Sequence, residues 1–243
     1  MITRVLATAL AAGFAAGVLV AVLQHFTTTP LILAAEVYET QAAAHASLYE
    51  TGEARLVLAH MGHDEAAGEA EWSPSDGLER TLFTSTVTVA TAVGFAFLLL
   101  AGFLFAGDAI DVRRALGWSA AGFVVTGLAP ALGLPPELPG MIAADLVPRQ
   151  AWWIATAAAT AAGLWLILRG NSLAMAALGV VLLIAPHVVG APHPATAEAS
   201  RVPAELAARF ASASLVVHAV LWAITGALVG LFWQRTGQAG AEA

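Results

Sequence analysis

The sequence predicts an all-α, polytopic integral membrane protein: a helical bundle of about six transmembrane helices in a single domain, residues 1–243. Hydrophobic residues make up 59% of the chain and charged residues only 11%, a balance that soluble globular domains do not normally show. Apolar stretches of roughly the 20 residues needed to cross a bilayer recur along the chain. They occupy residues 3–26, 82–106, 115–133, 150–168, 172–190 and 209–233. Five spans are the alternative, because the third stretch is short and ends in prolines.

The distribution of arginine between the connecting segments predicts the orientation. Short segments that carry arginine face the cytoplasm, and acidic residues contribute little to this rule. The N-terminal end, the second and fourth connections and the C-terminal tail hold five arginines and only three acids, whereas the remaining segments hold fourteen acids. We therefore expect a protein of the bacterial inner membrane with both termini in the cytoplasm and a long outer loop over residues 27–80.

The first stretch leads into this outer loop through Pro30. A proline can bend a helix without ending it, so the helix is expected to continue outward. Glu36 and Glu39 then lie three residues apart, on one helical face. Carboxylates at a membrane boundary are costly unless they are paired or functional. Two interpretations stay open: a role in an ion path, and a structural ion pair with Arg80 or Arg149.

The outer loop also carries His60 and His63, which two acids follow. If this segment is helical, the spacing places both imidazoles on one face. Neutral imidazole with carboxylate suits cobalt, nickel, zinc or copper, and the ligands alone do not select among these metals. An exposed pair of this kind would capture metal weakly. A solvated acidic loop with incidental histidines is the alternative.

The second stretch begins after turn-forming residues and the charged residues Asp76, Glu79 and Arg80. These three charges could gate an ion path. They are equally compatible with a capped helix start, because acids in the first turn favour the helix dipole. An arginine at that position would lie at the level of the lipid headgroups.

Prolines dominate the connection that follows the third stretch, residues 130–140. Irregular backbone is tolerated at membrane depth where it lines a cavity, so this segment is expected to re-enter the membrane or to line a cavity. Asp145 and Arg149 come next, beside Trp152 and Trp153, which anchor the fourth stretch at the membrane interface. Asp145 and Arg149 are candidates for gating or for structural ion pairs.

Three further histidines are expected near the outer face. His187 follows Pro186, where the helix of the fifth stretch loses regular bonds, and carbonyls freed beside an imidazole can bind a cation. His193 lies in the next connection, and His25 lies near the end of the first stretch. An interfacial histidine without such a role is the alternative for each. His218 has Leu, Val and Ala around it and is interpreted as a hydrogen-bonded core residue.

Composition and motifs exclude several classes of function. The chain has no cysteine, which removes disulfides, thiolate metal sites and iron–sulfur clusters. It contains no phosphate-binding glycine loop, dinucleotide fingerprint or nucleophile–base motif, so we expect neither an enzyme nor a nucleotide cofactor. The net charge of −7 disfavours nucleic acid as a partner and favours cations.

An ordered set of motifs runs through about residues 1–235. Its members are Gln24 with Pro30, AEVYE at 35–39, WSPSDGLERT at 72–81, GLPPELPG at 133–140, RQAWW at 149–153, Pro186 with His187, and GAP at 190–192. With these motifs the chain resembles the CbtA family, proposed cobalt transporter subunits of bacterial inner membranes. The resemblance implies cobalt uptake linked to cobalamin synthesis. It also implies a small, single-span, His-rich partner subunit, CbtB-like.

We therefore expect uptake of a divalent transition-metal cation through an outer funnel of histidine and carboxylate, with Co²⁺ as the transported substrate and other divalent transition metals as alternatives. Candidate metal ligands are Glu36, Glu39, His187, His25, His60, His63 and His193. Expected partners are membrane lipid, the metal ion, the CbtB-like subunit and, in a homo-oligomer, a second copy. Two other classes stay open: a membrane redox protein with two of His25, His187 and His218 as haem ligands, and a non-transporting scaffold.

The expected topology can be tested with reporter fusions. A reporter fused after Gly237 should be active in the cytoplasm, because an even number of spans returns the chain to the side on which it starts. Protease added to right-side-out vesicles should cut within residues 60–70. A fusion that is active only in the periplasm, or a protected 60–70 segment, would contradict the six-span arrangement.

Overall fold

The computed structural model describes residues 1–38, 74, 75, 77–194 and 200–239. Most of this part is helical, and no strand occurs within it. A helical segment, residues 28–38, follows the first helix after a one-residue interruption at Thr27. The other elements are α1 (Ile2–Phe26), α3 (Leu78–Ala106), α4 (Val112–Phe123), the π-helix η2 (Val124–Leu128), α5 (Ala129–Ala131), α6 (Leu146–Arg169), α7 (Leu173–Val189) and α8 (Ala204–Ala239).

Each apolar stretch that was expected to be a span is largely helical. The third stretch is covered by α4, η2 and α5, which follow one another without a break over residues 112–131. Among the described residues, α1, α3, α6 and α8 are long and apolar enough to cross a membrane, and α7 is a shorter apolar helix. The all-α membrane bundle is therefore confirmed. Crossing of the membrane by residues 112–131 and by α7 stays a prediction.

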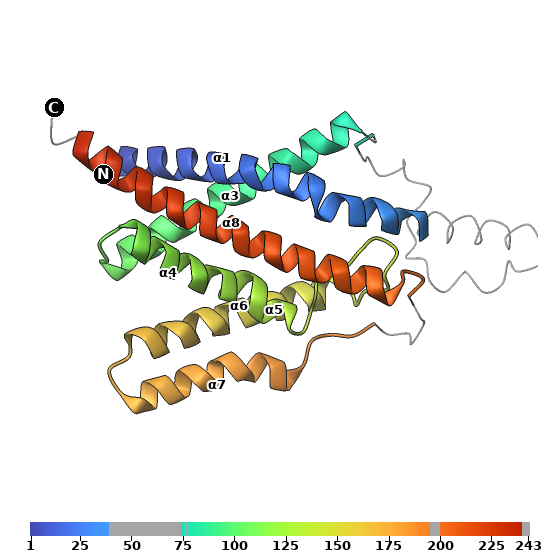
Figure 1. Ribbon diagram of the computed structural model, residues 1–243. Helices are drawn as coiled ribbons and strands as arrows, with labels where there is room; N and C mark the ends of the chain where they lie inside the picture. The colour runs from blue at the N-terminus through green and yellow to red at the C-terminus, as the bar shows by residue number, and fades with distance from the viewer. Residues whose placement is uncertain (39–73, 76, 195–199, 240–243) are drawn as a thin grey trace, which may run out of the picture.

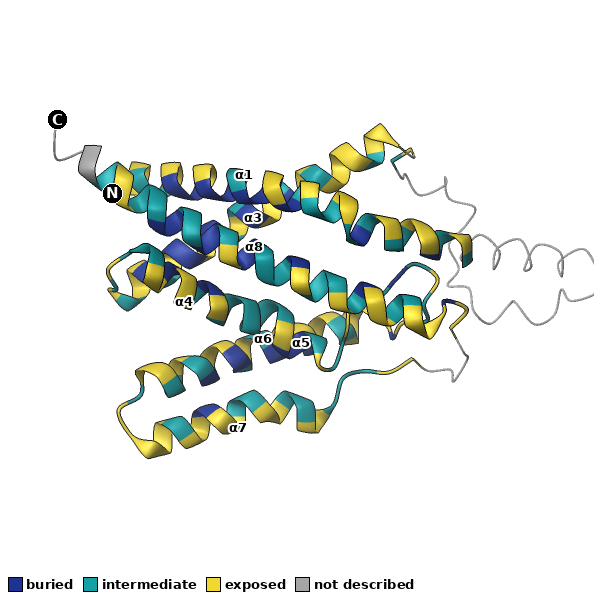
Figure 2. Ribbon diagram, in the orientation of Figure 1, coloured by how far each residue is buried: buried dark blue, intermediate teal, exposed yellow. Residues whose placement is uncertain are grey.

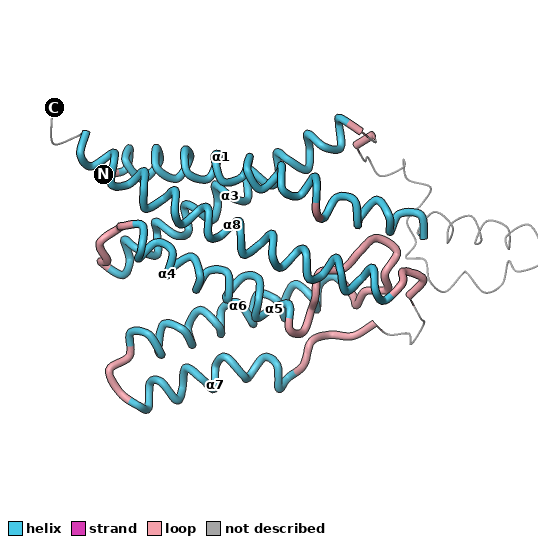
Figure 3. The backbone as a smooth tube through the Cα atoms, viewed as in Figure 1, coloured by secondary structure: helices cyan, strands magenta, loops and turns pink. Residues whose placement is uncertain are grey.

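Successive helices run in alternating directions, and the start of α1 and the end of α8 lie at the same end of the bundle (Figure 1). Arg4 of α1 donates a hydrogen bond from Nε to Thr236 Oγ1 of α8 at 3.2 Å, and its guanidinium lies 4.0 Å from the centre of the Trp233 ring. The short connections 107–111 and 170–172 lie at this same end, and the connection 132–145 lies at the opposite end (Figure 3). We name these the inner end and the outer end.

The bend expected at Pro30 is present. Pro30 has no N–H to donate to the carbonyl of Phe26, and its ring crowds that carbonyl, so α1 ends at Phe26. The Thr27 hydroxyl donates instead to the carbonyl of Leu23 at 2.7 Å. The chain then resumes a helical path that carries Glu36 to the outer end of the bundle.

Side-chain caps and one glycine shape the two short connections at the inner end. Asp111 accepts a hydrogen bond from the backbone N–H of Arg114 at 2.9 Å and begins α4. Ser172 accepts one from the N–H of Met175 at 3.3 Å and begins α7. Gly107 ends α3 with a φ of 69°, in the left-handed region that favours glycine. Both hairpins at this end can therefore be short.

Glycines are numerous in the apolar stretches, and they let neighbouring helices approach closely. A Cβ added at Gly13 of α1 would lie 2.4 Å from the Cα of Val93 in α3. One added at Gly163 of α6 would lie 2.7 Å from the carbonyl oxygen of Gly179 in α7. Lipid tails give no hydrophobic drive for helices to associate, so close van der Waals contact supplies it. Buried residues face neighbouring helices, whereas exposed residues face outward (Figure 2).

The contact between α1 and α3 predicts that replacing two different glycines by alanine has different effects on stability. Gly13→Ala should lower stability by about 1–3 kcal/mol, because the added methyl group meets backbone that cannot move aside. Gly94→Ala is the matched control: a Cβ there would meet nothing within 4 Å, and alanine favours helix. Thermal unfolding of the purified variants in detergent measures both. Equal stability of the two variants would contradict the close approach.

Candidate functional site

At the outer end, Glu36 is paired with Arg80. The guanidinium of Arg80 donates hydrogen bonds to both carboxylate oxygens, with Nη1 3.0 Å from Glu36 Oε2. Each side chain is 28% exposed. A bidentate, charge-assisted pair of this kind is among the stronger polar contacts in proteins. It joins α3 to the helical segment 28–38, and a metal ion would have to compete with it for the Glu36 carboxylate.

A second ion pair joins the proline-rich connection to α6. Arg149, in the first turns of α6, donates a hydrogen bond from Nη2 to Glu137 Oε2, and both side chains are about three-quarters buried. The Nε of Arg149 is buried without a hydrogen-bond partner among the described residues. Asp145 precedes α6 without a side-chain cap. Glu79 accepts a hydrogen bond from the backbone N–H of Ser75 at 3.2 Å, whereas the N-cap residue of α3, Gly77, makes no side-chain capping hydrogen bond.

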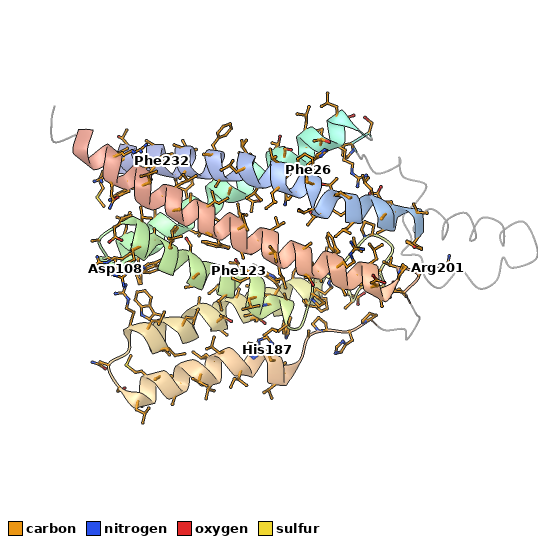
Figure 4. The ribbon with its side chains drawn as sticks, in the orientation of Figure 1. Phe26, Asp108, Phe123, His187, Arg201 and Phe232 are labelled. Carbon is orange, nitrogen blue, oxygen red and sulfur yellow. The ribbon has the colours of Figure 1, made fainter. Side chains whose placement is uncertain are left out.

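The three described histidines proposed as metal ligands occupy different surroundings. His25 is exposed at the end of α1, with its ring edge-on to Phe26. His187 lies near the outer end of α7 (Figure 4), and its ring centre is 5.8 Å from that of Trp152. The carbonyl of Pro186 accepts hydrogen bonds from Trp152 Nε1 at 3.2 Å and from the N–H of Gly190 at 3.0 Å. His193 is exposed.

Four of the predicted site residues, Glu39, His60, His63 and Asp76, lie outside the described residues. Within the part of the chain that the structure describes, no group of three or more His, Asp or Glu side chains is arranged to hold a metal ion. The described members of the outer metal site are therefore not brought together as one site. That site stays a prediction.

A cavity of about 770 Å³, which we call the outer cavity, lies between η2, α5, the proline-rich connection, α6 and α8. This confirms the expectation that the proline-rich segment lines a cavity. Most of the lining is apolar. The polar side chains that reach it are Thr126, Glu137, Arg149, Gln150, Ser214 and His218. The outer cavity thus brings a carboxylate and an imidazole to a common space within the bundle.

His218 of α8 lies at one limit of this cavity. There it forms a compact polar cluster with Thr126 of η2 and Trp222 of α8. The Oγ1 of Thr126 lies 3.0 Å from His218 Nε2. Trp222 Nε1 donates a hydrogen bond to Thr126 Oγ1 at 3.0 Å and lies 3.2 Å from His218 Nε2. The Thr126 hydroxyl also donates to the carbonyl of Gly122 at 2.9 Å. Thr126 Oγ1 is therefore the centre of the cluster, within hydrogen-bond distance of both His218 and Trp222.

Two glycines on the helix opposite make room for this cluster. A Cβ at Gly122 would lie 2.5 Å from the Trp222 ring, and one at Gly127 would lie 2.6 Å from the His218 ring. The two glycines are five positions apart in the sequence, which would put them about 140° apart around an α-helix. In the π-helix the bonds run from i to i+5, as from the N–H of Ala129 to the carbonyl of Val124. The wider turn therefore lets both glycines face α8.

Pro130 gives a local reason for the wider turn. In an α-helix the N–H of residue 130 would bond to the carbonyl of Thr126, but proline has no N–H and its ring crowds that carbonyl. Insertion of a wider turn is one of the recognised ways in which a helix accommodates such a break. The proline that ends the third stretch thus also sets the position of the Thr126 hydroxyl.

A second cavity of about 400 Å³, which we call the inner cavity, lies between α3, α4, η2, α6 and α8. Its lining is mainly apolar, and Thr126 belongs to the lining of both cavities. Arg169 lies on its lining, paired with Asp108, which also accepts a hydrogen bond from Trp118 Nε1 at 3.1 Å. Asp108 lies at the inner end (Figure 4). The polar cluster therefore stands between a cavity near each end of the bundle.

Sequence reasoning missed three residues of this arrangement: Thr126, Glu137 and Trp222. It anticipated His218 as a hydrogen-bonded core residue and, in the redox alternative, as a haem ligand. The structure confirms that His218 is hydrogen-bonded. A usable signal existed in the spacing of four between His218 and Trp222, which places both on one helical face. Nothing in hydropathy points to Thr126 as their partner.

Comparison with known proteins gives one match. The family model for CbtA, described as a probable cobalt transporter subunit, matches residues 2–234 of the chain. No curated protein and no solved structure matches. The match covers both cavities and the polar cluster between them.

The ion pair between Glu36 and Arg80 predicts a loss of stability in each single variant that the double variant partly recovers. Glu36→Gln and Arg80→Gln should each lower stability by about 1 kcal/mol, because each removes the charge-assisted hydrogen bonds between the two side chains in a partly buried position. The double variant should recover part of the loss. Thermal unfolding of the three purified variants in detergent tests this. Losses that simply add in the double variant would contradict a direct interaction.

Proposed function

The chain belongs to the CbtA family of probable cobalt transporter subunits, and from this premise we propose that it admits a divalent transition-metal cation, Co²⁺ foremost, across the bacterial inner membrane into the cell. The observation that carries the proposal is the outer cavity, where Glu137 and His218 line a common space whose walls are mostly apolar. Carboxylate and neutral imidazole are ligands that Co²⁺, Ni²⁺ and Zn²⁺ accept.

Entry is proposed to take place past the pair of Glu137 and Arg149. An isolated carboxylate would be costly at this half-buried position, and the guanidinium of Arg149 neutralises it while no metal is present. An arriving divalent cation offers twice the charge and can exchange for the guanidinium on Glu137. The pair of Glu36 and Arg80 lies at the same end of the bundle. The histidines His60 and His63 would raise the local metal concentration.

The membrane potential is the proposed source of energy. A single charge gains about 2.3 kcal/mol per 100 mV, so a divalent cation that moves inward gains about 4.6 kcal/mol. This orientation requires the inner end, with its arginines at positions 4, 114 and 169, to face the cytoplasm, as the distribution of positive charge favours. Concentration of the metal then needs no nucleotide.

The family description names a subunit, which implies that other subunits take part. We propose that the partner is the small, single-span, His-rich CbtB-like protein, which would deliver metal at the outer end. An imidazole-rich segment there would suit the exchange of a transition metal onto the Glu137 carboxylate, because both ligands are of the types that Co²⁺ accepts.

Uptake of radiolabelled Co²⁺ into cells that express the chain together with its proposed partner tests the function. Glu137→Gln should lower uptake at least about tenfold, since loss of a carboxylate from a partly dry cation site costs more than about 1.4 kcal/mol. Glu205→Gln is the control, because Glu205 is an exposed acid at the same end of the bundle.

Two results would contradict the proposal in different ways. Absence of Co²⁺ uptake by the wild-type chain with its partner would contradict the transport function itself. Unchanged uptake by a well-expressed Glu137→Gln variant would contradict only the proposed entry point.

A further inference from the structure

The polar cluster of Thr126, His218 and Trp222 lies between the two cavities and holds one imidazole, from His218. We propose that His218 is the ligand that receives the metal ion at the inner limit of the outer cavity, that Thr126 orients its imidazole, and that Trp222 closes the way to the inner cavity. This inference rests on the proposed function, namely that a divalent cation crosses the bundle.

The hydrogen bonds of Thr126 assign the free nitrogen of His218. The single hydroxyl proton of Thr126 goes to the carbonyl of Gly122, at 2.9 Å. Its oxygen lies 3.0 Å from both Trp222 Nε1 and His218 Nε2. The indole N–H of Trp222 also lies 3.2 Å from His218 Nε2 and can donate to either atom. We assign this N–H to the nearer atom, the Thr126 oxygen, which then also accepts from His218 Nε2. In this assignment Nε2 carries the imidazole proton and Nδ1 carries a lone pair. The described residues give Nδ1 no hydrogen-bond partner, and His218 lines the outer cavity.

This arrangement is the usual one for a histidine that binds a metal. One ring nitrogen donates its proton to a fixed oxygen, which sets the tautomer and the direction of the ring, and the other nitrogen faces the metal. Here Thr126 is the fixed oxygen and acts as a positioning residue. Its own place is secured by the π-helix and by the bond to Gly122.

A single imidazole in a cavity of about 770 Å³ leaves room for water on the other coordination positions of the ion. A transport site must bind well enough to admit an ion and weakly enough to release it. One nitrogen ligand meets that requirement, whereas a complete protein cage would trap the metal. Imidazole also favours Co²⁺, Ni²⁺ and Zn²⁺ over Mg²⁺ and Ca²⁺, which prefer oxygen ligands. His218 would therefore set the class of metal that passes.

Trp222 separates this site from the inner cavity. Its ring stacks on Phe95, with the centres 4.5 Å apart, and lines the inner cavity. Beyond it the lining includes Leu98, Val125 and Leu164, which offer no ligand to a hydrated ion. Hydrophobic constrictions of this kind block ions. Passage from His218 to the inner cavity therefore requires the Trp222 ring to leave Thr126.

The first experiment measures Co²⁺ bound per chain by equilibrium dialysis of the purified protein with radiolabelled Co²⁺. His218→Gln should abolish one binding event, because glutamine keeps a donor for Thr126 but removes the imidazole. Thr126→Val should weaken that event about 10- to 100-fold. Thr91→Val is the matched control, since Thr91 makes the same intrahelical bond, to Val87 at 2.8 Å, on an exposed face. Excess Ni²⁺ or Zn²⁺, but not Mg²⁺, should displace the bound Co²⁺.

The second experiment measures Co²⁺ flux in proteoliposomes. Trp222→Phe keeps the stacking on Phe95 but loses the donor to Thr126, so it should retain the binding event and raise the rate of Co²⁺ leak several-fold. The same vesicles with wild-type protein and partner test transport as such. Absence of Co²⁺ flux there overturns the proposed function, with or without binding at His218.

The inference about the cluster fails on other results. Folded His218→Gln protein with the full number of bound Co²⁺ ions and normal uptake would overturn the role of His218. Thr126→Val protein that binds as tightly as Thr91→Val protein would overturn the positioning role. If all three cluster variants lower the unfolding temperature but leave Co²⁺ binding unchanged, the cluster is purely structural.

Discussion

Trp222 and His218 fit into the spaces left by two glycines. This fit sets the distance between α8 and residues 112–131, and the two cavities depend on that distance. A side chain at position 122 or 127 would collide with the Trp222 ring or the His218 ring, so the cluster around Thr126 could not keep its geometry. In lipid, close packing and interhelical hydrogen bonds replace the hydrophobic drive that holds soluble bundles together. This one contact uses both. It therefore supports the stability of the bundle and the separation of its internal spaces at once.

The distribution of charge follows from the same environment. The described acids and arginines lie near the ends of the bundle, where several neutralise one another, as Glu137 and Arg149 do at one end and Asp108 and Arg169 do at the other. Uncompensated charge in the hydrocarbon region is costly, so the interior relies on groups that are polar without being charged. Neutral imidazole, hydroxyl and indole meet this condition. They can interact with a cation in transit without requiring a permanent counter-ion in the membrane.

Hydropathy was sufficient to locate the helices, because the length of an apolar stretch and the rise of an α-helix together set where a span begins and ends. The bend at Pro30 and the cavity beside the proline-rich connection were also predictable, since both follow from the missing N–H of proline. The lateral position of each helix was not. Sequence placed His187 and Glu36 at one end of the bundle, but it could not show that one lies against Trp152 and the other against Arg80. The prediction for His218 rested on its neighbours in the sequence, whereas its hydrogen-bond partner Thr126 is 92 residues away along the chain. The π-helix is invisible to hydropathy, because an apolar segment has the same composition in either helix.

The π-helix has a consequence for how such a site can arise. A chain with one residue fewer between Gly122 and Gly127 would have its glycines four apart, in register with His218 and Trp222, and the helices could pack in ordinary α-helical geometry. The additional residue acts as a single-residue insertion inside a membrane helix, where insertions are usually excluded. Because of this additional residue, Thr126 lies on the same helical face as both glycines. Its hydroxyl therefore takes part in a contact that would otherwise consist of the two glycines and the rings of His218 and Trp222. Insertion of one residue could in this way convert a packing surface into a polar site without displacing any residue that already packs there.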